Sequence, residues 1–341
     1  MPSTMPLPND GCTPAQAVAL RSSRTVVTGA AGFLGSHLCE RLIAYGSHVV
    51  GVDDLSTGRG ENLAALDEAD AFELLLHDVT LPFHVSGQVD YVFHLASPAS
   101  PLDYGKQPVR TLVTGSAGTL NALTLAAQKQ ARIVVASTSE VYGDPLEHPQ
   151  RESYWGNVNP VGPRSVYDEA KRYAEALTAA FGRTAQVDTA IVRIFNTYGP
   201  RMRPYDGRVV PTFIAQALAG QPLTVAGDGS QTRSLCFVDD TVSGLLALAT
   251  SGEREPVNIG NPHEITVLQL ADMIRELTGS ASSITHTPLP ADDPRRRCPD
   301  ITRARQALGW TPLVDLSAGL SRTIDAARAA TAGPALAGDA R

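Results

Sequence analysis

A tyrosine and a lysine four residues apart, Tyr167 and Lys171, have the residue types and the spacing for proton-transfer chemistry. On a helix this spacing places both side chains on one face. A free tyrosine, with a pKa of about 10, is a poor base at neutral pH, and an adjacent ammonium group favours its phenolate form. The chain has nine Tyr and only three Lys, so the pair is rarely expected by chance. It predicts an acid–base centre acting on a hydroxyl group; the alternative is a surface tyrosine beside a solvated lysine.

A second group of polar residues, Ser137-Thr138-Ser139-Glu140, follows a short run of apolar residues. Doubly wound sheets bind their ligands at the carboxyl ends of the strands, so these side chains are expected to face a ligand. We expect Thr138 to hydrogen-bond a substrate hydroxyl or carbonyl. For Glu140 two roles remain open, a second acid–base group or a structural carboxylate.

A glycine-rich loop, Gly29-Ala-Ala-Gly32-Phe-Leu-Gly35, joins the first predicted strand to the first predicted helix. Gly29 permits the tight turn, Gly32 lets the backbone approach a pyrophosphate, and Gly35 lets the helix pack closely on the strand. Asp53 ends the second predicted strand, where a carboxylate accepts hydrogen bonds from the adenosine ribose. The loop therefore predicts NAD rather than NADP. The alternative is a plain strand–helix turn with Asp53 as a helix cap.

The elements that position these residues are short apolar strands alternating with helices. This alternation is typical of an α/β fold with a doubly wound parallel sheet (Rossmann-type), which we expect to have about seven strands. A smaller C-terminal α/β substrate lobe is expected to close over the ligand. Strands are predicted at 24–28, 48–52, 72–76, 91–95, 133–136 and 189–195, and helices at 33–45, 109–129, 165–181 and 267–278.

These elements divide the chain into four parts. A loose N-terminal tail is expected over 1–22 and a frayed C-terminal tail over 329–341, because both lack lasting periodicity. The NAD-binding domain is predicted over 23–195 with parts of 235–262. The substrate-binding lobe is predicted mainly over 196–328.

Composition excludes several classes of protein. With 43% hydrophobic and 18% charged residues, the 341-residue chain can form a sizeable core. Its net charge of −7 argues against a nucleic-acid or anionic-membrane binder. No apolar run approaches the ~20 residues of a membrane-spanning helix, and no secretory signal is recognised. Cys12, Cys39, Cys236 and Cys298 form no CxxC pair, so we expect a cytoplasmic protein without a metal site.

Longer motifs point to one family. GAAGFLG, STSEVYG, YDEAK and RIFNTYGPR occur in this order, and HLASPASPLDY (94–104) and YWGNVNPVGPR (154–164) are more specific strings. With them the chain resembles the UDP-glucuronate decarboxylase (UDP-xylose synthase) family of the extended short-chain dehydrogenase/reductases, over about residues 24–327.

The resemblance implies a function and a set of roles. The function is NAD-dependent decarboxylation of UDP-glucuronic acid through a UDP-4-keto intermediate to UDP-xylose, with NAD recycled, by a homodimer formed through the helices after Val109 and Ser165. Catalysis would fall to Thr138, Glu140, Tyr167 and Lys171. NAD would contact Gly29, Gly32, Phe33, Leu34, Gly35, Asp53, Asp78, Leu95, Tyr167 and Lys171. The UDP-sugar would contact Tyr104, Asn121, Asn196, Arg208, Gln231, Arg233 and Arg297.

Within this set, the resemblance places Arg297 near the sugar carboxylate. The alternative for Arg297 is one of three consecutive solvated arginines.

Three positions depart from the family pattern. Val113 stands in place of a lysine expected near the substrate, Gly115 in place of an asparagine that supports the catalytic network, and Ala226 in place of a tyrosine near the base. Loss of one charge-assisted contact costs about 1–3 kcal/mol of binding. We therefore hypothesise looser retention of the intermediate, with some release of UDP-4-keto-xylose.

Other functions compete with this one. A nucleotide-sugar 4,6-dehydratase typically has an Asp-Glu pair after the threonine, but here the pair is Ser139-Glu140. A 4-epimerase shares the tyrosine–lysine signature but not the HLASPASP and YWGNVNP strings. A non-catalytic NAD-binding module is the remaining alternative, and the intact Tyr167 and Lys171 argue against it.

Overall fold

The computed structural model describes residues 13–162, 164–185, 187–289 and 296–332. Its centre is a sheet of seven parallel strands in the order β11-β6-β5-β4-β1-β2-β3. The inner strands are buried on both faces, which explains their continuous apolar sequences. The strands are β1 (Arg24–Thr28), β2 (His48–Asp53), β3 (Phe72–Leu76), β4 (Tyr91–His94), β5 (Arg132–Thr138), β6 (Thr189–Ile194) and β11 (Val257–Ile259). The predicted α/β fold with a doubly wound parallel sheet is confirmed.

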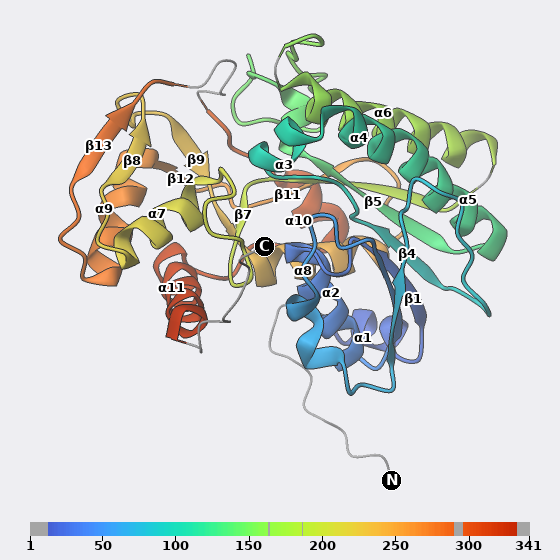
Figure 1. Cartoon of the computed structure of the whole chain (residues 1–341). Helices are drawn as coiled ribbons and strands as arrows, with labels where there is room; N and C mark the ends of the chain where they lie inside the picture. The colour runs from blue at the N-terminus through green and yellow to red at the C-terminus, as the bar shows by residue number, and fades with distance from the viewer. Residues whose placement is uncertain (1–12, 163, 186, 290–295, 333–341) are drawn as a thin grey trace.

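Helices cover both faces of this sheet (Figure 1). On one face lie α4 (Pro108–Val113), α5 (Thr119–Lys129) and α6 (Ser165–Thr184). On the other lie α1 (Pro14–Leu20), α2 (Phe33–Ala44), α8 (Val238–Ala249) and α10 (Thr302–Leu308). The strand order reverses between β1 and β4, and this switch point opens the crevice in which such folds bind their ligands.

A smaller lobe stands beside the carboxyl ends of the strands (Figure 1). Two helices, α7 and α9, pack on each other, and α9 packs on the parallel pair β8–β13. The antiparallel pair β9–β12 lies nearer the sheet, and β7–β10 is a short parallel pair. The bounds are β7 (Thr197–Tyr198), α7 (Val209–Leu218), β8 (Leu223–Ala226), β9 (Thr232–Ser234), β10 (Cys236–Phe237), β12 (Glu264–Thr266), α9 (Val267–Thr278), β13 (Ile284–Thr287) and α11 (Leu316–Ala332).

Three further short helical segments are η1 (Gly60–Leu66), α3 (Pro101–Lys106) and η3 (Ser139–Tyr142). A fourth, the π-helical turn η2 (Thr114–Gly118), separates α4 from α5, where one continuous helix was expected. Such π turns are frequent at functional sites. Here Thr114 within it lines the central cavity.

Both ends of the described part of the chain are helical where tails were expected. Instead of a loose tail through residue 22, the chain forms α1, because Thr13 and Gln16 make a capping box and Pro14 occupies the first turn. Leu20 of α1 is fully buried in the core. At the other end α11 continues to Ala332, four residues into the predicted frayed tail. Residues 1–12 and 333–341 lie outside the described part of the chain.

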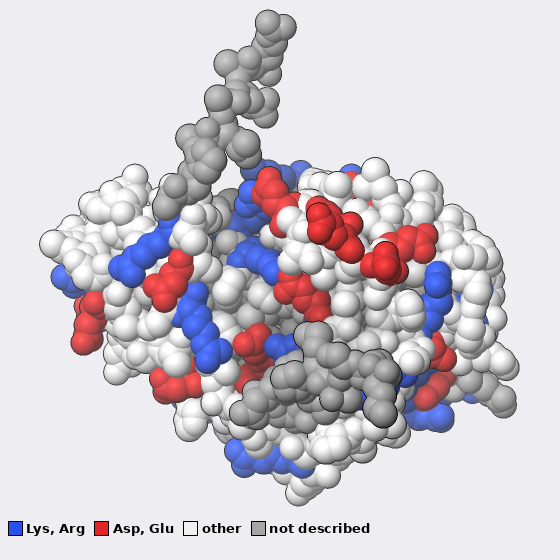
Figure 2. Space-filling view, turned by 90° about the horizontal axis from the view of Figure 1, so that it is seen from below, with Lys and Arg blue, Asp and Glu red and all other residues white. Residues whose placement is uncertain are grey.

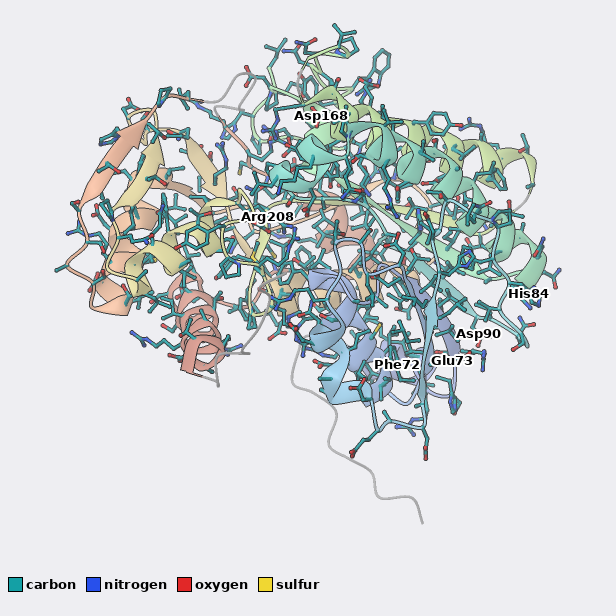
Figure 3. All side chains as sticks on the ribbon, in the orientation of Figure 1. Phe72, Glu73, His84, Asp90, Asp168 and Arg208 are labelled. Atoms are coloured by element: carbon teal, nitrogen blue, oxygen red, sulfur yellow. The ribbon has the colours of Figure 1, made fainter. Side chains whose placement is uncertain are left out.

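Strand β3 forms one edge of the sheet, and Figure 3 labels its first two residues, Phe72 and Glu73. Leu74 and Leu76 are exposed there, and Glu73 lies 3.6 Å from the guanidinium of Arg24 on β1. The face of the molecule seen in Figure 2 carries acidic and basic side chains interspersed. Among the described residues, no helix combines the length and the apolar character needed to cross a membrane.

Candidate active site

One cavity of about 640 Å³ runs from the glycine loop past the carboxyl end of β5 to the smaller lobe. Arg208 lies between the two lobes in Figure 3. All but one of the predicted site residues line this cavity: Gly29, Gly32, Phe33, Leu34, Gly35, Asp53, Asp78, Leu95, Tyr104, Thr138, Glu140, Tyr167, Lys171, Asn196, Arg208, Gln231, Arg233 and Arg297. The exception is Asn121, whose side chain donates instead to the Val79 carbonyl at 2.9 Å.

The glycine loop requires glycine for geometric reasons. Gly29 has φ +75°, and a Cβ there would lie 2.9 Å from the Ala96 backbone nitrogen. A Cβ on Gly35 would overlap the Gly29 carbonyl oxygen. No side chain caps the N-terminus of α2 at Gly32, so its backbone N–H groups stay available to an anion.

Asp53 ends β2 beside this loop. Its carboxylate accepts hydrogen bonds from the backbone N–H of Ala31 at 2.9 Å and of Leu55 at 2.8 Å. Burial nevertheless raises its pKa. Asp78 lies farther along the cavity wall, where Arg110 reaches its carboxylate at 3.3 Å. The loop and the two carboxylates thus form a cradle suited to a dinucleotide with a free ribose hydroxyl.

Tyr167 and Lys171 project from the first turns of α6 towards the end of β5. Lys171 Nζ donates to the Ala136 carbonyl at 2.8 Å and lies 5.9 Å from the centre of the Tyr167 ring. The Thr138 hydroxyl hydrogen-bonds Tyr167, and its oxygen also accepts from the Glu140 backbone N–H at 3.3 Å. The structure therefore brings the predicted tyrosine, lysine and threonine together.

The pKa values of this group differ from expectation. Burial and the Glu140 charge raise the pKa of Tyr167 above its usual range. Burial also lowers the pKa of Lys171 to about 8. The lysine therefore does not bring the pKa of Tyr167 below its usual value in the protein alone, because burial outweighs nearby positive charge and Lys171 Nζ donates to the Ala136 carbonyl.

Glu140 is held by two arginines. Arg164 Nη2 donates to its Oε2 at 2.8 Å, and Arg297 Nη1 lies 3.3 Å from its Oε1. Burial opposes ionisation of Glu140, but the guanidinium charges of Arg297 and Arg164 outweigh it and lower the pKa to about 2. Glu140 is thus ionised at neutral pH, which favours the structural carboxylate over the acid–base group.

The burial of Arg297 separates the two alternatives considered for it. Its side chain is 1% exposed, and Nη2 also donates to the Gly143 carbonyl at 3.1 Å. Arg297 is therefore not one of a run of solvated arginines. Sequence reasoning missed Arg164, although it ends the string YWGNVNPVGPR directly before α6.

Tyr104 lies against the Tyr167 ring. The two rings are stacked, with centroids 5.3 Å apart and an interplanar angle of 11°. Tyr104 is carried by α3, and Asp103 beside it forms an ion pair with Arg203. This contact links the loop after β7 to the ring that covers Tyr167.

Polar groups of the smaller lobe complete the cavity. Arg208 Nε lies 3.2 Å from the Asp206 carboxylate, and Gln231 Nε2 donates to the Ala226 carbonyl at 2.8 Å. Arg233 Nη1 donates to the Thr232 carbonyl at 2.9 Å. The cationic side chains of Arg208 and Arg233 line the same cavity as the glycine loop, as a bound diphosphate would require.

Comparison with known proteins agrees with this arrangement. Residues 25–260 match the NAD dependent epimerase/dehydratase family. The chain is 52% identical to UDP-glucuronic acid decarboxylase 1 of Arabidopsis thaliana, with 88% of this chain and 69% of that protein covered. It is 50% identical to UDP-glucuronic acid decarboxylase 1 of Xenopus tropicalis, with 88% and 71% covered. The chain belongs to the UDP-glucuronic acid decarboxylase family. This confirms the resemblance drawn from its motifs.

The fold of this family member is also similar to that of a solved UDP-glucuronic acid 4-epimerase from Bacillus cereus, in complex with UDP-glucuronic acid and NAD. The TM-score is 0.79 at 27% identity, over 90% of this chain and 99% of the epimerase. Fold alone therefore does not separate decarboxylase from epimerase.

Of the three departures from the family pattern, two lie outside the cavity. Val113 on α4 is 41% exposed and is not among the lining residues. Gly115 packs against α6, where a Cβ would lie 2.7 Å from the Cβ of Ala170. Only Ala226 lines the cavity. Ala170 thus occupies the space that an asparagine side chain at position 115 would need.

Asp168 was not among the predicted site residues of this decarboxylase family member. It is buried at the start of α6, where Figure 3 labels it, and its Oδ1 has no hydrogen-bond partner among the described residues. Burial and the Glu140 charge raise its pKa to about 7. Its position directly after Tyr167 in the YDEAK motif was the available signal.

Proposed function

We propose that this chain converts UDP-glucuronic acid to UDP-xylose and carbon dioxide, with NAD as a recycled cofactor. The observation that carries the proposal is the meeting, in one cavity, of the glycine loop, the Tyr167–Thr138 pair and the Glu140–Arg164–Arg297 cluster. The glycine loop suits a dinucleotide, and the Tyr167–Thr138 pair suits a sugar hydroxyl. The cluster with its two arginines suits a sugar carboxylate.

The residues present fit NAD. The glycine cradle and the uncapped N-terminus of α2 suit the pyrophosphate, and Asp53 suits the adenosine ribose. Asp78 and Leu95 line the space between them and Tyr167. Lys171 would hold the nicotinamide ribose. NAD, when bound, supplies the reversible two-electron oxidation at C4 of the sugar.

Tyr167 would take the proton of the C4 hydroxyl, while Thr138 holds the same oxygen by a hydrogen bond. Because burial raises the pKa of Tyr167, its phenolate needs nearby positive charge before it can act as a base. Lys171 and the bound cofactor would provide it. The product of this step is a 4-keto sugar whose C5 bears the carboxylate, which is a β-keto acid.

Decarboxylation then breaks the bond between C5 and the carboxylate carbon. The electron pair of that bond moves into the C4 carbonyl, where Tyr167 and Thr138 stabilise the developing oxyanion, and carbon dioxide leaves. A proton added at C5 and reduction at C4 complete UDP-xylose. Arg297 would hold the carboxylate until it leaves, with Glu140 and Arg164 keeping the guanidinium in place.

The nucleotide would lie across the smaller lobe. Arg208 and Arg233 would neutralise the diphosphate, with Gln231 and Asn196 as hydrogen-bonding partners and Tyr104 against the sugar. Ala226 leaves space where the base would lie. Asn121 would not contact the substrate, since its amide donates to the Val79 carbonyl outside the cavity.

The assembly proposed is a homodimer in the cytoplasm. Exposed apolar side chains of α4, α5 and α6, among them Val109, Leu120 and Tyr173, support an interface on the outer face of these helices. Three buried cysteines without disulfides support a reducing compartment. Light scattering on the purified protein would measure the mass of the assembly.

The deciding experiment incubates purified protein with UDP-glucuronic acid and NAD, identifies products by NMR and mass spectrometry, and follows the absorbance of reduced cofactor. UDP-xylose with flat absorbance is expected. UDP-4-keto-xylose with rising absorbance would indicate release of the intermediate. UDP-galacturonic acid without loss of carbon dioxide would favour the 4-epimerase.

Two further outcomes address the remaining alternatives. If UDP-glucuronic acid is unchanged, dehydration of a glucose nucleotide in the same assay would favour the 4,6-dehydratase. NAD binding without turnover of any nucleotide sugar would favour a non-catalytic module.

A further inference from the structure

Three side chains of types that ligate metal ions meet outside the main cavity. They are His148 in the loop after η3, Glu264 at the start of β12, and Cys298 in the segment after Arg297. Their ligand atoms, one from each residue, all lie within 4.8 Å of one another, and His148 Nε2 lies 2.9 Å from Glu264 Oε2. The three come from segments more than 30 residues apart, so the fold alone brings them together.

We propose that His148, Glu264 and Cys298 form a binding site for Zn²⁺ or a similar divalent transition-metal ion, with water as the fourth ligand. This site goes beyond the proposed decarboxylase function and does not depend on it. Imidazole nitrogen, carboxylate oxygen and thiolate sulfur are the three ligand types that Zn²⁺ uses in proteins. Mg²⁺ and Ca²⁺ prefer oxygen ligands alone and are therefore disfavoured.

The separations are close to those that Zn²⁺ requires. With metal–ligand distances of about 2.0–2.3 Å, the ligand atoms of a tetrahedral site lie roughly 3.3–3.7 Å apart. The hydrogen-bonded pair His148–Glu264 must open slightly, and any longer separation must contract by about one ångström. Both His148 and Glu264 are partly exposed, so their side chains can make these adjustments and a water molecule can reach the ion.

Surrounding hydrogen bonds hold two of the ligands. The second carboxylate oxygen of Glu264, Oε1, accepts from the Thr232 hydroxyl at 2.5 Å, which leaves Oε2 turned to His148. Cys298 is fixed through its backbone: its N–H donates to Gln150 Oε1 at 2.9 Å, and its carbonyl accepts from the Gln150 N–H at 2.8 Å. Such outer partners orient ligands at metal sites.

The Cys298 thiol is chemically able to change partner. Its Sγ donates to the Pro262 carbonyl at 3.3 Å, a weak hydrogen bond that the metal–sulfur bond would replace. On binding, Cys298 loses its proton to solvent and the thiolate coordinates the ion. Because Arg297 precedes Cys298 and donates to Gly143 in the same loop as His148, the ion would fasten the arginine segment to that loop.

The test uses the full chain and the metal alone. After dialysis against a chelator, the protein is titrated with Co²⁺ and followed by absorbance, then with Zn²⁺ in competition with a chromophoric chelator. We expect one equivalent of Co²⁺ to produce a near-ultraviolet thiolate-to-metal band that Zn²⁺ abolishes. We also expect Zn²⁺ at saturation to raise the Tm by about 3 °C, as for any ligand that binds only the folded state.

Variants decide which residues bind. Cys298→Ser should abolish the cobalt band, and His148→Gln should weaken Zn²⁺ binding by at least about tenfold. The matched control is Cys12→Ser, which removes a thiol outside the described residues and should keep the band. If no band forms, or if it survives Cys298→Ser and His148→Gln, the proposal is overturned. His148 is exposed, so its replacement keeps the test decisive even if Cys298→Ser fails to fold.

Discussion

Tyr167 and Lys171 line the same cavity as Glu140 and Arg297. Burial determines the direction of the pKa shifts of Tyr167 and Lys171, whereas neighbouring positive charges determine that of Glu140. Around Tyr167 and Lys171 the loss of water moves both groups towards their neutral forms. Around Glu140 the same loss of water is outweighed by two guanidinium groups, and the carboxyl stays ionised. A buried ionisable group therefore keeps its charge only where an opposite charge is already built beside it.

The difference suggests that the two groups of residues have separate roles in the cavity. In the Glu140–Arg164–Arg297 cluster, the charge of the Glu140 carboxylate is already compensated within the protein. The Tyr167–Lys171 pair is incomplete and is expected to become active when ligands add their charges.

Replacing Tyr167 removes the acid–base group itself. Tyr167→Phe should lower kcat for UDP-xylose formation by at least about 10³-fold, because no hydroxyl remains to exchange the C4 proton. The control is Tyr173→Phe on the same helix, which keeps the ring, removes only a hydroxyl outside the cavity and should keep wild-type turnover. Activity of Tyr167→Phe within tenfold of the wild type would exclude the proposed base.

Breaking the charged cluster should affect both stability and turnover. Arg297→Met leaves Glu140 with Arg164 alone and should cost about 3–5 kcal/mol of unfolding free energy, as for other broken buried pairs. It should also lower kcat/KM by about 10²-fold through the lost carboxylate contact. The neighbouring exposed Arg296→Met is the control, with an expected change within about 0.5 kcal/mol.

A double-mutant cycle sharpens this result. Adding Glu140→Gln to Arg297→Met removes the carboxylate that the first change left under-compensated. The summed single losses, measured by urea unfolding, should then exceed the loss of the double variant by about 1–3 kcal/mol. Strict additivity would show that the two side chains do not interact as the structure indicates.

The pH profile tests the burial-governed pair. Burial lowers the pKa of Lys171 to about 8, so its ammonium form is present below this pH and is lost above it. Because Tyr167 acts as the phenolate and its pKa lies above that of Lys171, kcat/KM should rise by roughly tenfold per pH unit up to about pH 8 and then level off, as loss of the ammonium offsets gain of the phenolate. Lys171→Arg, which keeps its charge, should remove this plateau, so that its kcat/KM goes on rising above pH 8 even if it is slower. A wild-type kcat/KM that goes on rising by about tenfold per pH unit to pH 10 would contradict the pKa shift of Lys171.

Asp168 combines the two influences, because both burial and a neighbouring charge shift its pKa. Its replacement should give the smallest effect on stability. Burial raises its pKa to about 7, so the folded protein holds this proton between pH 4 and 7 where the unfolded chain releases it. Its contribution to stability therefore falls as pH rises through this range. Asp168→Asn should exceed the wild type by about 1–3 kcal/mol at pH 8 and match it near pH 4. Glu169→Gln is the control in urea unfolding at both pH values.

Local geometry explains what could be predicted from the sequence. Gly29 is favoured by its positive φ and Gly35 by its contact with Gly29 in the same loop, and the spacing of Tyr167 and Lys171 follows the period of one helix. The longer strands and helices were predictable for the same reason. Helix α7 was not, because its sequence VVPTFIAQAL is apolar on all sides and contains a proline. Strand β11 has only three residues, too few for a periodic signal.

Contacts between distant segments account for the rest. Arg297 pairs with Glu140 across 157 positions, so neither its burial nor the ionised state of Glu140 follows from local sequence. The same applies to the meeting of His148, Glu264 and Cys298, where spacing along the chain suggested no metal site. The outward position of Val113 depends on how α4 packs, which a motif alone does not determine.

The exposed edge of the sheet has a consequence for handling the protein. Strand β3 reads FELLL, and its outer backbone groups have no partner strand among the described residues. Leu74 and Leu76 add apolar surface to this edge, which is the kind of segment on which a second chain adds as another strand. Glu73 supplies the only charge within the strand. Removing that carboxylate would turn a sheet margin into a nucleus for aggregation without any change inside the cavity.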